Sequence, residues 1–92
     1  MRFKMLGSGS KGNACLVHTQ DKTLLIDAGI PIQTLGRRIQ EAKVAPDAIL
    51  ITHEHSDHSK ALKSYLRSHD IPVYLTQKTA EALGLDHPKT KI

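Results

Sequence analysis

The sequence predicts an α/β fold in which helices flank a mixed sheet. Short apolar runs that favour strands occupy the N-terminal part, and amphipathic stretches with helical spacing follow them. The two kinds of segment then alternate along the rest of the chain, which is typical of a layered α/β arrangement. A length of 92 residues is enough for one domain at most, so we expect residues 1–92 to form a single unit.

The first elements are expected to be strands. Residues 2–6 (RFKML) alternate modestly between polar and apolar side chains. Residues 13–19 (NACLVHT) and 23–29 (TLLIDAG) favour strands, and the polar turn at residues 20–22 predicts that they form a hairpin.

A helix and a further strand come next. Pro31 suits the first turn of a helix, in which Ile32, Leu35 and Ile39 recur at spacings of three and four. Residues 48–52 (AILIT) form a short continuous apolar run, which predicts a strand covered on both faces.

The remaining residues predict a helix, a strand and a last helix. Ser56 or Asp57 can cap the first of these helices, which carries an apolar stripe (Ala61, Leu62, Tyr65, Leu66) and a charged face (Lys60, Lys63, Arg67). Residues 71–76 (IPVYLT) predict a strand, Thr76 can cap the last helix, and Gly84 can end it.

Residues 7–12 (GSGSKG) match G-x-G-x-x-G, the glycine pattern of dinucleotide-binding turns. That fingerprint needs a helix after the last glycine, whereas residues 13–19 favour a strand and residues 20–22 a turn, which leaves no room for a helix before residue 23. The Walker A pattern fails as well, because Lys11 precedes the last glycine. We therefore expect a tight loop whose backbone N–H groups face a nearby site.

Composition and charge limit the function further. The single cysteine, Cys15, excludes an intrachain disulfide, and no apolar run is long enough for a signal peptide or a membrane span, so we expect a cytoplasmic protein. The net charge of +4 permits a polyanionic partner. For the basic residues behind this charge, a solvated surface and a phosphate-binding surface are equal alternatives. With three aromatic residues, base-stacking platforms are not expected.

Residues 51–59 (ITHEHSDHS) hold three of the six histidines of the chain. On an extended backbone, residues two apart point to the same side, so His53 and His55 can bind one metal ion. If the chain then turns into a helix, Asp57 and His58 diverge from that pair and can face a second ion. Such ligands suit Zn²⁺ and also Mn²⁺ or Fe, and residues 51–59 contain no cysteine to close a structural zinc site. We predict a divalent metal site here and structural roles for the other histidines (His18, His69, His87).

The H-x-H-x-D-H motif, preceded by LLIDAG at residues 24–29, resembles the metallo-β-lactamase superfamily of metal-dependent hydrolases. The opening MRFKMLGSGSKGNA is similar to the YycJ/WalJ-like branch, regarded as DNA exonucleases that act from the 5′ end. The likeness runs from residue 1 to about residue 85. It implies an αββα sandwich, of which this chain would form the N-terminal half.

The resemblance also implies a role for each site residue. His53 and His55 would bind the first metal ion and Asp57 and His58 the second, while Asp57 also orients the attacking hydroxide as the catalytic residue. Asp27 would brace the metal loop from behind the ligands. A complete site would hold two divalent ions, zinc foremost with manganese as the alternative, and this chain would hold one of them. The loop residues that would contact phosphate are Ser8, Ser10, Lys11 and Asn13, with simple solvation of the loop as an equal alternative.

Two departures from the family pattern affect the expected function. Ala61 stands where glycine often follows the motif, and a later histidine, a bridging aspartate and a final histidine would all lie beyond residue 92. We therefore expect a truncated metal-dependent phosphodiesterase or 5′–3′ DNA exonuclease. The alternatives are a non-catalytic metal-binding or interaction module, and a hydrolase of the superfamily with another substrate. The expected partners are a DNA 5′ end and either a second copy or a complementing C-terminal half, without a membrane.

Overall fold

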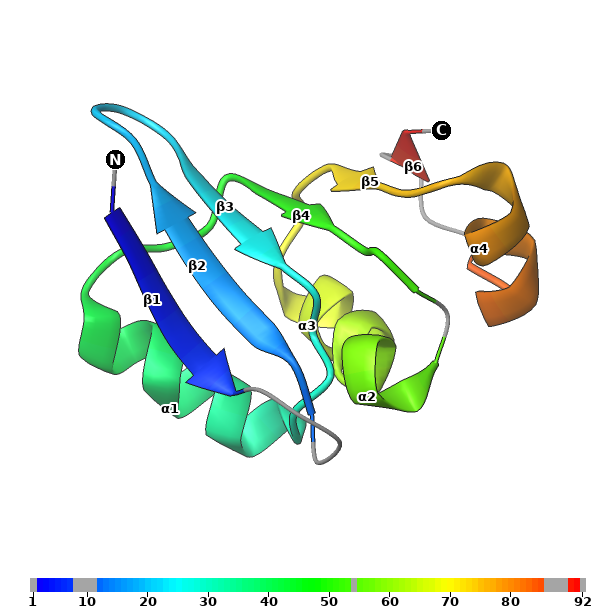
Figure 1. Cartoon of the computed structure of the whole chain (residues 1–92), viewed down its shortest axis with the longest axis horizontal. Coiled ribbons are helices and arrows are strands. Elements are labelled where there is room, and N and C mark those ends of the chain that lie inside the picture. The colour runs from blue at the N-terminus through cyan, green and yellow to red at the C-terminus, as the bar shows by residue number, and fades with distance from the viewer. Residues whose placement is uncertain (1, 8–11, 54, 86–89, 92) are drawn as a thin grey trace.

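The computed structural model of the chain contains a six-stranded sheet whose strands lie in chain order (Figure 1). It describes residues 2–7, 12–53, 55–85 and 90–91, and for Ser56, Asp57 and Lys91 the backbone alone. The strands are β1 (Arg2–Gly7), β2 (Ala14–His18), β3 (Thr23–Ile26), β4 (Ala48–Leu50), β5 (Val73–Tyr74) and β6 (Thr90–Lys91). The helices are α1 (Ile32–Ala42), α2 (Ser56–Ser59), α3 (Leu62–Ser68) and α4 (Gln77–Leu83).

The sheet is mixed, as the sequence predicts. Strands β1, β2 and β3 pair antiparallel, and β3 to β6 pair parallel. Parallel neighbours need crossover connections, which α1, the α2–α3 segment and α4 provide. The predicted α/β class is thereby confirmed. Strand β6 is an addition, because no strand was predicted after the last helix.

One face of the sheet packs on helices and forms the core. Alternate strand residues such as Leu16, Leu25 and Ile49 point to this face and are fully buried. Helix α1 adds Leu35 and Ile39 to the core, and α3 adds Leu62 and Tyr65. Ile32 differs from its prediction, since it lies 36% exposed at the first residue of α1.

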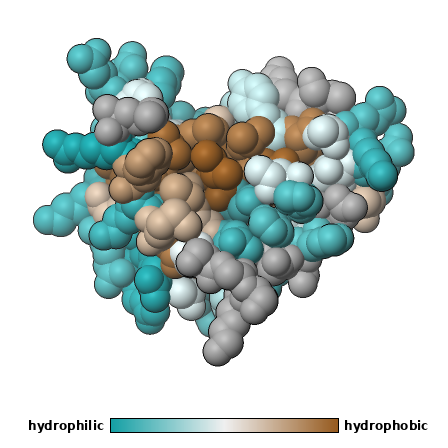
Figure 2. Space-filling model, in the orientation of Figure 1, coloured by the Kyte–Doolittle hydropathy of each residue, from teal (hydrophilic) through white to brown (hydrophobic). Residues whose placement is uncertain are grey.

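The opposite face of the sheet, which we call the open face, carries none of the helices that the structure describes. Directly paired residues share a face, so the registers of β1 to β5 place nine apolar side chains there: Phe3, Met5, Cys15, Val17, Leu24, Ile26, Ala48, Leu50 and Tyr74. All are half-buried or exposed, and Figure 2 shows hydrophobic residues gathered on this side of the molecule. The expectation that residues 48–52 are covered on both faces is therefore wrong for Ala48 and Leu50 in this structure.

The helix predicted after the histidines is divided into α2 and α3. Ala28 N–H donates to the carbonyl of His58 (2.7 Å), and Ala61 N–H donates to the carbonyl of Ala28 (2.8 Å). The carbonyl of His58 and the N–H of Ala61 therefore bond to the segment after β3 instead of to an adjacent turn of a helix. The predicted faces are retained, since Ala61, Leu62 and Tyr65 are buried while Lys60, Lys63 and Arg67 are exposed.

The last helix begins and ends where the sequence predicts. The Thr76 hydroxyl accepts a hydrogen bond from Thr79 N–H (3.1 Å), and Gly84 ends α4 in the left-handed conformation. No helix within the described parts of the chain is long and apolar enough to cross a membrane.

Candidate metal centre

The histidines lie at one edge of the sheet, where three segments meet. Strands β3 and β4 are parallel, so their carboxyl ends share this edge, and β2 begins there because it runs antiparallel to β3. Gly29 N–H donates to the carbonyl of Asn13 (2.9 Å), and the Ala28–His58 bond joins the segment after β3 to the segment after β4. Ligand sites of open α/β sheets form at the carboxyl ends of strands, so the edge suits a functional site.

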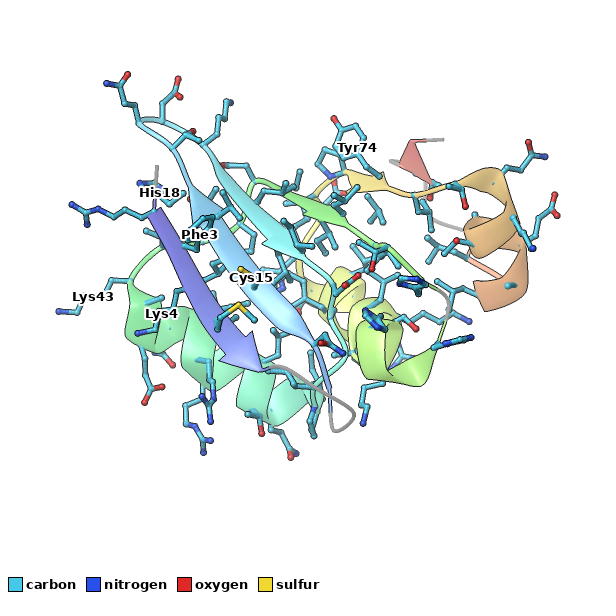
Figure 3. The ribbon with its side chains drawn as sticks, in the orientation of Figure 1. Phe3, Lys4, Cys15, His18, Lys43 and Tyr74 are labelled. Carbon is cyan, nitrogen blue, oxygen red and sulfur yellow. The ribbon has the colours of Figure 1, made fainter. Side chains whose placement is uncertain are left out.

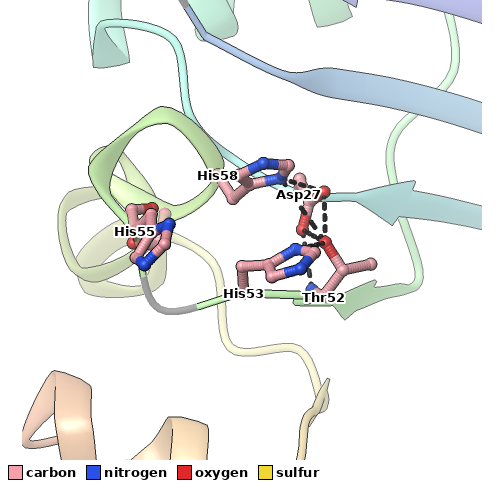
Figure 4. A network of polar contacts seen from close by, with 6 residues as sticks. Asp27, Thr52, His53, His55 and His58 are labelled. Atoms are coloured by element: carbon pink, nitrogen blue, oxygen red, sulfur yellow. Dashed lines mark hydrogen bonds and ion pairs between the residues drawn. The ribbon is translucent and has the colours of Figure 1, made fainter. Parts of the chain in front are cut away.

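Asp27 turns the chain at this edge. Its N–H donates to the carbonyl of Leu50 (2.8 Å), which extends the pairing of β3 with β4 by one residue. Its φ of 64° lies in the left-handed region, which aspartate adopts more readily than most residues other than glycine. The turn brings its carboxylate, in a residue only 5% exposed, against Thr52 and His58 (Figure 4).

The buried carboxylate of Asp27 is fully hydrogen-bonded. Oδ1 accepts from the backbone N–H of Thr52 (2.8 Å), and the Thr52 hydroxyl lies 3.0 Å from Oδ1 and 2.8 Å from Oδ2. Oδ2 also lies 2.8 Å from Nδ1 of His58. These partners compensate the removal of the carboxylate from water, which is costly without them. Among the described residues, no buried polar side-chain atom lacks a hydrogen-bond partner.

The hydrogen bonds assign the tautomers of two histidines. An ionised carboxylate only accepts, so the Thr52 hydroxyl gives its single hydrogen to Asp27. The contact between that hydroxyl and Nδ1 of His53 (3.0 Å) then requires the hydrogen to be on His53. The carboxylate of Asp27 also lies against Nδ1 of His58, so Nδ1 of His58 carries a hydrogen as well. In the neutral ring of either residue, Nε2 is then the nitrogen with a lone pair for a metal ion.

The spacing of the rings differs from the pairing expected from the sequence. The ring centres of His53 and His58 lie 4.8 Å apart, whereas those of His53 and His55 lie 6.2 Å apart. Two imidazoles on one tetrahedral ion have ring centres about 5 Å apart, given metal–nitrogen bonds of about 2 Å. The His53–His58 spacing is close to that value, whereas the His53–His55 spacing is wider than a tetrahedral ion allows. Imidazole and carboxylate donors suit a divalent ion.

The described side chains do not by themselves complete a site. Among them, no three or more His, Cys, Asp or Glu side chains are grouped as they would be around a metal ion. The backbone of Asp57 belongs to α2, but its side chain lies outside the described part of the structure. The donor set therefore fits a divalent ion in its chemistry, and His53, His55, Asp57 and His58 remain predicted ligands.

The glycine loop has a packing role at the same edge. A Cβ on Gly12, whose φ is 137°, would lie 2.5 Å from the Gly29 carbonyl oxygen, and one on Gly7 would lie 2.7 Å from the Ile30 side chain. Glycine is thus required where the loop meets the segment after β3. Three of the predicted phosphate contacts, Ser8, Ser10 and Lys11, lie outside the described residues, and Asn13 lies at the edge.

Two of the other histidines, His18 and His69, lie away from this edge of the sheet. Nδ1 of His18 is 2.6 Å from the Thr23 hydroxyl, and the ring of His69 stacks on Tyr65 with centres 3.9 Å apart. His87 lies outside the described residues. A groove of about 200 Å³ lies near His18, between β1 and the end of α1, and its lining includes none of the predicted site residues.

Thr52 is the site residue that the sequence analysis does not single out. Its hydroxyl contacts Asp27, His53 and, at 3.4 Å, Nδ1 of His58. The available signal was its position, as a hydroxyl residue between the strand and the first histidine.

Similarity to known proteins agrees with this arrangement. Residues 7–91 match the family described as the metallo-beta-lactamase superfamily. The chain is 41% identical over 86 residues to the exodeoxyribonuclease YycJ of Bacillus anthracis. That alignment covers 90% of this chain and 33% of the relative, so the chain spans about a third of the length of the relative.

Solved structures show the same fold. The B3 metallo-beta-lactamase BLEG-1 matches with a TM-score of 0.74 and 32% identity, over 87% of this chain and 39% of that one. TTHA1623 in a di-iron-bound form matches with a TM-score of 0.67 and 34% identity, over 92% of this chain and 48% of that one. With a family match over nearly the whole chain and the same fold in both structures, the chain belongs to the metallo-β-lactamase superfamily.

Proposed function

We propose that the chain provides the metal-binding part of a metal-dependent phosphodiesterase that degrades DNA from its 5′ end. The observation that carries the proposal is the network in which Asp27 and Thr52 hold two histidines by their Nδ1 atoms. The identity of 41% to an exodeoxyribonuclease supports DNA as the substrate class.

The proposed ligands are His53 and His55 for one ion and Asp57 and His58 for a second. Zinc is the proposed metal, with manganese as the alternative. When bound, such ions would supply Lewis-acid stabilisation of the charge that develops on a phosphodiester. Asp27 keeps a proton on Nδ1 of His58 and thereby directs Nε2 outward as a ligand. Asp57 is the proposed catalytic residue that orients the attacking water.

Exposed basic residues that follow the histidines in the sequence support a polyanionic substrate. Lys60, Lys63 and Arg67 lie on the segment that follows the histidines, and all three are exposed. The chain as a whole carries a formal charge of +4. We propose that phosphates are bound by Ser8, Ser10, Lys11 and Asn13, which lie in the sequence between the end of β1 and the start of β2.

The test is hydrolysis of a DNA duplex labelled separately at its 5′ and 3′ ends, with the zinc-loaded or manganese-loaded chain. We expect release of the 5′ label as mononucleotides, loss of that release in His53→Ala, and its retention in His69→Ala, which removes a histidine at the far end of α3. Absence of metal-dependent release would contradict the proposal. Retained metal without turnover would then favour a non-catalytic module, and turnover of thioesters or lactams alone would favour another hydrolase.

A further inference from the structure

The hydroxyl of Thr52 lies between the buried carboxylate and two histidine rings. Its oxygen is 2.8 Å from Oδ2 of Asp27, 3.0 Å from Nδ1 of His53 and 3.4 Å from Nδ1 of His58. Figure 4 shows these two rings beside Asp27 and Thr52, with His55 apart from them. The side chain of His55 forms no hydrogen bond with any of the described residues, and its ring centre lies 6.2 Å from that of His53.

This hydroxyl connects His53 to the carboxylate. It gives its single hydrogen to Asp27, and one of its lone pairs accepts the hydrogen on Nδ1 of His53. Asp27 is therefore the carboxylate partner of both rings, of His58 directly at 2.8 Å and of His53 through the hydroxyl. A carboxylate behind a metal-binding imidazole fixes the tautomer and the orientation of the ring.

The two rings that the hydroxyl holds belong to different pairs of proposed ligands. His53 is proposed for the first ion and His58 for the second, and their ring centres lie 4.8 Å apart. The Nδ1 atoms of both rings face the hydroxyl, so the Nε2 atoms point away from it, toward the position of the metal. The ions of two-metal sites lie about 3.5–4 Å apart, a separation that neighbouring rings can serve. One hydroxyl can thus orient a ligand of each ion.

We propose that Thr52 is a positioning residue of the metal centre, whose hydroxyl keeps the hydrogen of His53 on Nδ1 and, with Asp27, orients the rings of His53 and His58. The proposal rests on the proposed function for the metal itself. The tautomer of His53 can be measured without metal. Since Thr52 is exposed, exchange of its hydroxyl for a methyl group in Thr52→Val opens no cavity.

The test compares the wild-type chain with Thr52→Val and Thr52→Ser by two measurements. In ¹⁵N NMR of the metal-free chain at mildly alkaline pH, His53 should carry its hydrogen on Nδ1 in the wild type and in Thr52→Ser. In Thr52→Val the acceptor is lost, so the hydrogen should divide between Nδ1 and Nε2, while the signals of His55 stay unchanged. In competition with a chromophoric chelator, Thr52→Val should bind zinc about 10-fold to 100-fold more weakly, and Thr52→Ser should restore most of the affinity.

The matched control is Thr23→Val. The Thr23 hydroxyl also contacts Nδ1 of a histidine, His18, at 2.6 Å. His18 ends β2 and pairs with Arg2 at the start of β1, at the edge of the sheet opposite to the candidate metal centre (Figure 3). Thr23→Val should change the signals of His18 and leave the zinc affinity unchanged, and circular dichroism checks that each variant is folded.

The outcomes separate this proposal from the proposed function. A wild-type chain that binds no zinc would overturn the proposed function. Zinc binding that is equally tight in Thr52→Val and Thr23→Val would overturn the role of Thr52 alone. So would a His53 ring that keeps its hydrogen on Nδ1 in Thr52→Val.

Discussion

Asp27→Asn keeps the shape of a side chain at the candidate metal centre but changes one of its hydrogen-bond acceptors into a donor. The amide oxygen can replace Oδ1 and still accept from Thr52 N–H, which lies 2.8 Å away. The amide NH₂ then occupies the position of Oδ2, where it faces Nδ1 of His58 at 2.8 Å. Two donors cannot share a hydrogen bond, so His58 must give up its Nδ1 proton and carry the proton on Nε2.

The size of the effect follows from this reversal. A proton on Nε2 occupies the position that a metal ion needs, so binding must either displace it or leave two donors in contact. Loss of a carboxylate partner of a metal-binding histidine typically lowers metal affinity 10-fold to 100-fold. That range corresponds to roughly 1.4–2.8 kcal/mol of binding free energy. We expect Asp27→Asn to weaken zinc binding by this amount.

Two measurements test the reasoning. Competition with a chromophoric chelator gives the zinc affinity, and ¹⁵N NMR of the histidine rings in the metal-free chain gives the tautomer of His58. The control is Asp47→Asn, since Asp47 also accepts a backbone N–H, that of Thr23 at 2.8 Å, in a different part of the sheet. The assignment of a proton to Nδ1 of His58 would be wrong if Asp27→Asn binds zinc as tightly as Asp47→Asn does. It would also be wrong if His58 keeps its Nδ1 proton in the Asp27→Asn variant.

Three further predictions concern the same structure. Gly12→Ala should lower the free energy of unfolding by roughly 2–4 kcal/mol, because its Cβ meets a carbonyl oxygen at a strained φ. Gly36→Ala should raise the free energy of unfolding by about 0.5–1 kcal/mol, because a Cβ at this helical position meets open space. Urea denaturation measures both changes in the free energy of unfolding, and two changes of the same sign would contradict the packing argument. Burial raises the pKa of the Tyr65 phenol above its ordinary value of 10.0. Its contribution to stability is therefore complete below pH 10 and lost as the pH rises through the folded pKa. An absorbance titration of Tyr74→Phe, which isolates Tyr65, should have its midpoint above 10, and a midpoint at or below 10 would refute the shift. Thr52→Val should cost about 1–2 kcal/mol of stability, because its hydroxyl bonds a buried carboxylate, whereas Thr52→Ser should retain most of it.

The sequence predicts those parts of the fold in which local signals act alone. The hairpin of β2 and β3, the helix that follows Pro31 and the cap at Thr76 all depend on nearby residues, and all are present. The division of α2 from α3 could not be predicted in this way. It depends on Ala28, which lies about thirty positions earlier and bonds to the helix from another segment.

The candidate site was predictable in its residue types but not in its contacts. The motif identifies the histidines, and the family resemblance assigns Asp27 to a position behind them. That Thr52 bonds this carboxylate, and that the ring of His53 lies nearer to His58 than to His55, depends on the turn at Asp27. A positive φ at aspartate has no clear sequence signal, because asparagine and aspartate adopt it in only some contexts.

The proposed function depends most on whether the segment after β4 binds a divalent cation. The direct measurement is the zinc content of the pure chain after incubation with zinc and dialysis, beside that of a His53→Ala, His58→Ala double variant. We predict about one zinc ion per wild-type chain and none in the double variant. Equal zinc contents in the two proteins, or none in the wild type, would contradict the metal site and the function proposed from it.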